Sequence, residues 1–164
     1  MDIDDLLPRS RTPADYLRVV DDPRLGEAAL HGLAASPLPF MRLAVAGQAR
    51  ASAATLLRVL AGDFDRWDRD RLLFVVAGHP RADRAVLLVV LAEVSTMLRK
   101  PQWRPYPAPA VLALAGRTDL RPEEFRAVAN LPGVSRRLRR DLTARLAARE
   151  TAPGMVDQAH ERSS

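Results

Sequence analysis

The chain has 164 residues, a hydrophobic fraction of 48% and a formal net charge of +5, which fits one domain with a sizeable core. It contains no cysteine, so disulfides, thiolate metal sites and cysteine nucleophiles are excluded. The N-terminus is acidic where a secretory signal would be basic, and the longest wholly apolar run, 85–92, is far shorter than the ~20 residues that cross a membrane. We therefore expect a cytoplasmic protein without membrane association.

Aromatic residues make up only 5% of the chain, so Leu, Val and Ala must form most of the core. Such small aliphatic side chains suit closely packed helices, and the predicted fold class is all-α. Residues 1–11 are polar and are expected to be a loose N-terminal segment. The predicted helical domain spans 12–150. Its first three helices have start signals at Thr12-Pro13, Asp22-Pro23 and Ser36-Pro37.

The middle of the chain predicts three further helices. Ser52 is expected to cap the fourth helix, and Gly62 to end it in a left-handed conformation. After a polar connection over 63–68, a fifth helix should run from about Arg69 to Gly78. Asp83 should cap the sixth, which is apolar on nearly every side from 85 to 94 and is therefore predicted to be the most buried.

Segments 72–76 and 86–91 leave an alternative open. They are short and rich in β-branched residues, so their pattern alone does not separate a buried helix from a buried parallel strand. The helix-capping residues and the Ala- and Leu-rich segment 53–61, which aligns with the second of them, favour helices.

The last third begins with four prolines within 99–109, which predict an extended connection. A short helix is expected over 110–114, another from Pro122, and a last one after Ser135 with Leu138, Leu142 and Leu146 facing inward. The prediction totals about eight helices. Residues 151–164 are polar and are expected to be a disordered tail.

Residues 45–61 align with 76–92 without a gap, at a spacing of 31 residues. Segment 128–135 matches 76–83 as a third, diverged copy in which Ser135 takes the capping position of Asp83 and Ser52. Repetition at this spacing is typical of stacked helical units that bury their apolar faces against one another.

The repeated residues also carry a family resemblance, through Leu33-Ala34, Ser36-Pro37, Arg42, Val45-Ala46 and 56–61, and in the next unit Arg71, Val76-Ala77 and His79-Pro80. This pattern resembles the leucine-rich repeat variant of the HEAT-like α-solenoid superfamily, well over 33–92 and more weakly over 107–149. Gln48-Ala49 departs from it by replacing a corner proline. The resemblance implies a short right-handed α-solenoid that serves as a binding surface, and it implies no reaction.

No catalytic, cofactor or metal site is predicted. Four aspartates lie within 63–70. An EF-hand loop needs glycine at its sixth position and glutamate at its twelfth, but in a loop starting at Asp63 these positions hold Asp68 and Phe74. Arg66 and Arg69 lie among these aspartates and Arg71 follows them, so helix capping and local ion pairs are the better interpretation. The three histidines lack ligand spacing, and neither a nucleophile with its base nor a Gly-rich phosphate loop can be assembled.

The function predicted from sequence is protein recognition by a non-catalytic scaffold or adaptor whose partner is another protein. Trp, Tyr and Arg dominate interface hot spots, and six such residues lie at repeat corners or on the proline-rich connection. These candidate contact residues are Arg50, Arg81, Arg84, Trp103, Arg104 and Tyr106. Because residues 1–40 are acidic and the remainder is basic, weak head-to-tail self-association is a further possibility.

The alternative is nucleic-acid binding by the last helix. There Arg136, Arg137 and Arg140 are expected to lie opposite the buried leucines, with Arg139 at the flank. A solvated face on an Arg-rich chain is the simpler interpretation, since no aromatic residue lies among these arginines.

Overall fold

The computed structural model describes residues 12–100 and 106–151, which form α-helices joined by turns. The helices are α1 (Pro13–Asp21), α2 (Glu27–Leu33), α3 (Pro39–Ala46), α4 (Ala53–Leu60), α5 (Arg66–Ala77), α6 (Arg84–Leu98), α7 (Ala108–Ala115), α8 (Pro122–Ala129) and α9 (Arg136–Thr151). The all-α prediction is confirmed for these ranges. They contain nine helices, one more than about eight, and none is long and apolar enough to span a bilayer.

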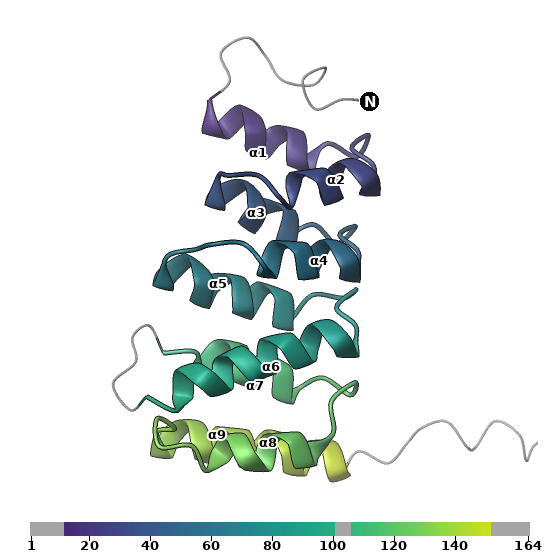
Figure 1. Cartoon of the computed structure of the whole chain (residues 1–164). Helices are drawn as coiled ribbons and strands as arrows, with labels where there is room; N and C mark the ends of the chain where they lie inside the picture. The colour runs from purple at the N-terminus through teal and green to yellow at the C-terminus, as the bar shows by residue number, and fades with distance from the viewer. Residues whose placement is uncertain (1–11, 101–105, 152–164) are drawn as a thin grey trace, which may run out of the picture.

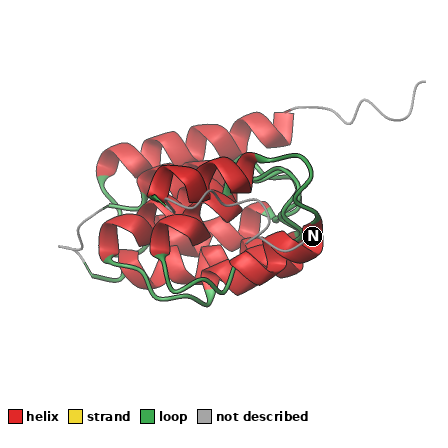
Figure 2. Cartoon of the chain, turned by 90° about the horizontal axis from the view of Figure 1, so that it is seen from above, coloured by secondary structure: helices red, strands yellow, loops and turns green. Residues whose placement is uncertain are grey.

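The helices form two layers (Figure 1). In the first layer α1, α3, α5, α7 and α9 each pack on the next, and in the second α2 packs on α4 and α4 on α6. The layers are joined by contacts such as α3 with α4, α5 with α6 and α6 with α7. Figure 2 looks down this stack and shows the layers side by side. Helix α8 packs on α9 at the lower end.

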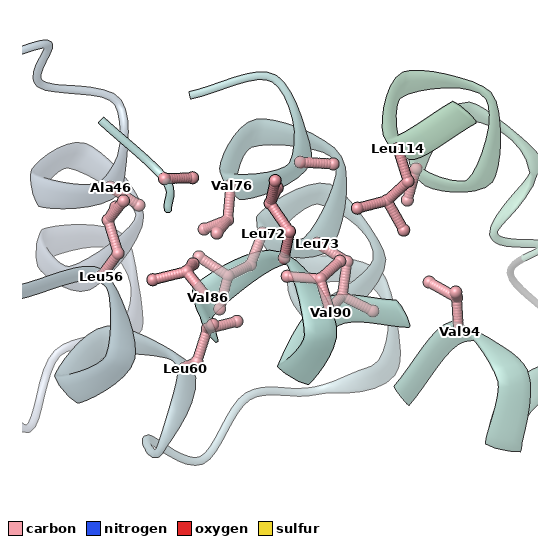
Figure 3. Packing of buried hydrophobic residues seen from close by; sticks show 14 of the residues in the cluster. Ala46, Leu56, Leu60, Leu72, Leu73, Val76, Val86, Val90, Val94 and Leu114 are labelled. Carbon is pink, nitrogen blue, oxygen red and sulfur yellow. The ribbon is translucent and has the colours of Figure 1, made fainter. Parts of the chain in front are cut away.

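The core fills the space between the layers (Figure 3). Leu72, Leu73 and Val76 of α5 are fully buried, as are Val86 and Val90 of α6. Both segments bury positions at three- and four-residue spacing, so the strand alternative for 72–76 and 86–91 is wrong.

Helix α6 has seven buried residues, more than any other described helix, as predicted, but it is not buried on every side. Leu88 and Val89 are 37% and 43% exposed, because α6 lies in the second layer and only one of its faces meets α4, α5 and α7. Residues 85–92 therefore include an apolar strip on the outside of the stack.

Several helix starts follow the sequence. The side chains of Thr12, Ser52 and Asp83 each accept a hydrogen bond from a backbone N–H three residues on, at 3.3, 3.3 and 3.0 Å. Ser135 does the same for Leu138, at 3.1 Å. These bonds satisfy N–H groups that the first helical turn leaves without a partner.

Four helix starts differ from the prediction. Helix α7 begins at Ala108 rather than at 110, and so includes the last two residues of the expected extended connection. Helix α3 begins at Pro39 rather than after Ser36, because Leu38 precedes a proline and takes an extended conformation. Helix α2 begins at Glu27, because Asp22 instead closes a turn by accepting a hydrogen bond from the Arg24 N–H at 2.8 Å. Helix α5 begins at Arg66, within the predicted connection 63–68, because Asp65 caps it.

Gly62 does not have the predicted left-handed conformation. Its role is to leave space, since a Cβ there would lie 2.0 Å from Nη1 of Arg42. That guanidinium donates to the carbonyl of Asp63 at 3.3 Å, and its Nε to the carbonyl of Ser36 at 2.5 Å. Gly62 thus lets Arg42 join the turn before α3 to the turn before α5.

The aligned segments have the same turn. The N–H groups of Ala51 and Ala82 donate to the carbonyls of Gln48 and His79, at 2.8 and 3.1 Å, and Val134 donates likewise to Leu131 at 3.0 Å. The third copy therefore matches in its local turn. Its helices differ in placement, because α9 packs on α7 and this turn leads into the first layer, whereas those of the first two copies lead out of it.

Candidate functional site

The turns that leave α1, α3, α5 and α7 lie along one side of the stack, which we call the corner edge (Figure 1). Arg50, in the turn between α3 and α4, is directed at the turn between α1 and α2. Its guanidinium donates to four backbone carbonyls at 2.9–3.2 Å, those of Val20, Asp22, Pro23 and Leu25. Arg50 therefore joins successive turns.

The next turn repeats this arrangement with a histidine. His79 is 4% exposed, and its Nε2 lies 2.9 Å from the carbonyl oxygen of Gln48. Its Nδ1 accepts a hydrogen bond from the Arg81 N–H at 3.1 Å, so Nε2 must carry the proton that is donated to Gln48. Arg81 adds a bond to the carbonyl of Arg50 at 2.6 Å. His79, one of the three histidines without ligand spacing, is thus a second connection between turns.

Arginines continue the pattern below. Arg117 donates to the carbonyls of His79 and Ala82, both at 2.7 Å. Arg149 of α9 donates to the carbonyls of Ala115 and Leu120 at 3.1 and 2.6 Å. Each turn along the corner edge is therefore bonded to the one above it, and α9 closes the series.

The predicted contact residues at this edge all have internal partners. Arg84 donates to the carbonyl of Asp119 at 2.7 Å and pairs with Glu124 at 2.7 Å, and this pairing lowers the pKa of Glu124. Arg81 and Arg84 keep 49% and 44% of their side chains exposed, whereas Arg50 is partly buried. Their contact with a partner stays a prediction. Their structural role is to bond turns that are distant in the sequence.

A groove of about 1060 Å³ opens elsewhere, between α5, α7 and α9. Its floor is α7, whose residues there are Ala108, Pro109, Leu112 and Ala113. Phe74 of α5, 49% exposed, lines one side, and Arg137 and Arg145 of α9 line the other.

The groove exists because α7 carries small side chains between two helices with long ones. The axes of packed helices lie about 8–10 Å apart. At that spacing the short side chains of α7 reach less far outward than Phe74 of α5 and the arginines of α9, so the surface of α7 is lower than those on either side. The turn before α9 closes one end with Pro132, Gly133 and Val134. The result is a mostly apolar depression with charge at one wall.

That charge is mainly positive. Arg137 is 87% exposed and lies 3.8 Å from Asp141, which also pairs with Arg140 at 3.1 Å. Arg145 donates to the carbonyl of Leu112 at 3.1 Å. The groove lining therefore holds two guanidinium groups against one carboxylate.

Tyr106 is the predicted contact residue that the structure places at this groove. Its hydroxyl accepts a hydrogen bond from the Ser135 N–H at 2.8 Å, which holds the ring against the turn before α9. Trp103 and Arg104 lie outside the described residues, as do the expected loose segment 1–11 and residues 152–164 of the expected tail.

The basic last helix has a different surface. Arg136, Arg139 and Arg140, with Thr143 and Ala144, line a shallow depression of about 520 Å³, while Arg137 lies on the groove side. Arg139 donates to the carbonyl of Ala129 at 3.0 Å. The four arginines of the alternative prediction thus serve two surfaces instead of one face.

The aspartate cluster after Gly62 shapes the chain locally. Asp65 caps α5 by accepting hydrogen bonds from the N–H groups of Trp67 and Asp68, both at 2.8 Å. In the described ranges no three His, Asp or Glu side chains come together in a way that would hold a metal. Asp70 has one carboxylate oxygen buried without a hydrogen-bond partner, and burial raises its pKa.

Sequence reasoning missed Phe74, Leu112 and Arg145 as candidate contact residues. Phe74 lay within a segment predicted to be buried, and Arg145 within a general excess of arginine. A usable signal was the composition of 108–115, which holds four alanines and no charge. A helix with such small side chains, packed between helices with longer side chains, is expected to form the floor of a groove.

Comparison with protein-family models, with curated proteins and with solved structures finds no match to this chain.

Proposed function

We propose that this chain is a non-catalytic helical-repeat module that recognises another protein through the groove between α5, α7 and α9. The observation that carries the proposal is the groove itself, a preformed apolar depression of about 1060 Å³ beside the half-exposed Phe74. A preformed apolar site with a few charged groups is the usual form of a binding site, because little ordering is required when the partner arrives.

As architecture we propose a short right-handed α-solenoid of HEAT-like or leucine-rich repeat variant units. Three observations support it: the two layers, the shared turn of the segments 31 residues apart, and the hydrogen bonds between successive turns at the corner edge. In such a stack each unit contacts its neighbours alone, which leaves one long face of each layer for partners.

The test is a pair of exposed apolar residues changed to the same acid. Phe74→Glu places a charge at the groove, and Leu57→Glu places one on α4, where Leu57 is 37% exposed. Partners would be captured from the native cell with the full chain and with both variants, after circular dichroism has shown equal folding. We expect Leu57→Glu to keep a partner that Phe74→Glu loses. Equal capture by both variants would contradict the proposal.

The depression lined by Arg136, Arg139 and Arg140 favours nucleic-acid binding as a second candidate. Three guanidinium groups on one helix face could meet successive phosphates. Anisotropy of labelled double-stranded DNA and RNA, at low and near-physiological salt, tests it. Micromolar binding that survives the higher salt and weakens when these arginines become Glu would support this candidate. Binding that vanishes with salt would leave protein recognition in front.

A further inference from the structure

We infer that the groove receives an amphipathic helix whose apolar face lies on α7 and whose acidic side chains meet Arg137 and Arg145. The inference rests on the proposed function and specifies the partner's chemistry.

The shape of the groove favours a helix as the occupant. Helices α5 and α9 are next-nearest neighbours in one layer, so their axes are about 16–20 Å apart, two interaxial distances. A bound helix would lie over α7 rather than in line with it, at the usual interaxial distance of about 8–10 Å. Its axis would then be about 11–14 Å from the axes of α5 and α9, within reach of the long side chains of both walls. The small residues of α7 allow a close approach, since interaxial distance depends on the side chains at the contact.

The described residues do not favour an extended peptide. Extended segments usually bind by adding a strand to an exposed sheet edge, and residues 12–100 and 106–151 contain no strand. The floor instead presents Leu112 and Ala113 beside Phe74, an apolar strip of the kind that accepts the i, i+3, i+4 and i+7 anchors of a helix.

The charge of the groove specifies acidic residues on the partner. Arg137 and Arg145 are separated by eight residues of α9, or about 12 Å along its axis. On a bound helix, positions seven apart lie on one face about 10.5 Å apart, so carboxylates at n and n+7 would reach both guanidinium groups. Asp141 lies between the two arginines and already pairs with Arg140, so it disfavours a third acid at the centre.

The test uses a phage-displayed library of random peptides selected on the full chain, because it does not presuppose the partner. We expect enriched peptides with apolar residues at helical spacing and acidic residues about seven positions apart. Binding of a synthetic copy should be lost with Phe74→Glu. It should weaken about fivefold or more with Arg137→Glu or Arg145→Glu, as expected for an exposed ion pair turned into a repulsion. Arg136→Glu is the matched control, since it changes the same charge one residue away and outside the groove.

The outcomes separate this inference from the proposed function. Peptides that need Phe74 but are basic, uncharged or proline-rich would overturn the acidic helix and leave the groove as a binding site. Equal weakening by Arg136→Glu and Arg137→Glu would overturn the placement of the acids. Enriched peptides indifferent to Phe74→Glu, or no enrichment at all, would overturn the inference, and the former would also count against the groove.

Discussion

At the scale of single residues, the backbone approaches Gly133 so closely that only glycine fits. Its N–H donates to the carbonyl of Leu98 at 2.7 Å, and a Cβ would lie 2.4 Å from that oxygen. We expect Gly133→Ala to destabilise the chain by about 1–3 kcal/mol, as overpacking does, because a backbone atom cannot move aside alone. Gly32→Ala is the control: nothing lies within 4 Å of its Cβ position in α2, so a gain of roughly 0.5–1 kcal/mol is expected. Urea unfolding of both variants measures the difference, and equal midpoints would contradict the close approach.

Asp70 supplies a pH-dependent prediction at the same scale. Burial raises its pKa above 3.8, so the folded chain holds this proton more tightly than the unfolded chain does. The contribution of Asp70 to stability is therefore greatest when the carboxyl is protonated, and it falls as pH rises through the folded pKa. We expect Asp70→Asn to be more stable than the natural chain at pH 7, with a smaller difference at about pH 4.

The measurement is the urea midpoint at both pH values. Asp63→Asn is the matched control because Asp63 is exposed and lies in the same acidic cluster. A lower stability of Asp70→Asn at pH 7 would show that the carboxylate has a favourable role in the folded chain.

At the scale of elements, the existence of a helix was easier to predict than the residue at which it begins. Capping side chains marked α1, α4 and α6, because one local hydrogen bond decides such a start. Helix α3 was placed too early, since Ser36-Pro37 and Pro39 both resemble a helix start and only the conformation of Leu38 separates them.

The groove depended on packing that no local pattern contains. Phe74, Leu112 and Arg145 come from three helices that are distant in sequence, and they meet because alternate helices form one layer. The arginines at the corner edge illustrate the same limit. The aligned segments indicated their positions at the turns. The carbonyls to which they donate belong to the preceding turn, about 30 residues earlier, and no local pattern shows that contact, so the sequence favoured a surface role.

The bonding at the corner edge predicts a cost for replacing Arg50. Arg50→Lys keeps the charge but cannot reproduce a planar guanidinium that bonds four carbonyls. We expect a loss of about 1–3 kcal/mol in the free energy of unfolding, the range for hydrogen bonds to a charged group. Arg58→Lys on the exposed face of α4 should change it by less than about 0.5 kcal/mol. If chemical denaturation gave the same small effect for both, Arg50 would not be stabilising the turn above it.

At the scale of the whole molecule, stability should vary along the stack. Helix α1 packs on α3 and α9 on α7, so the two ends are coupled only through the units between them. In the repeat architecture that we propose, the free energy of unfolding is close to a sum of unit and neighbour terms, and one end can open while the rest stays folded. Leu30→Ala at the upper end, where Leu30 is fully buried, and Leu142→Ala at the lower end, where Leu142 is 1% exposed, should therefore act locally.

Hydrogen exchange measured by mass spectrometry distinguishes local opening of one end from cooperative unfolding of the whole chain. We expect Leu30→Ala to accelerate exchange in α1, α2 and α3 and to leave α8 and α9 unchanged, with the reverse pattern for Leu142→Ala. Leu73→Ala, in the central helix α5, should lower protection on both sides because α5 contacts α3, α6 and α7. Uniform acceleration across all helices in every variant would mean that the chain unfolds as one cooperative unit. Local opening at the lower end would also remove the charged wall of the groove, because α9 supplies that wall and would be released with the terminal unit.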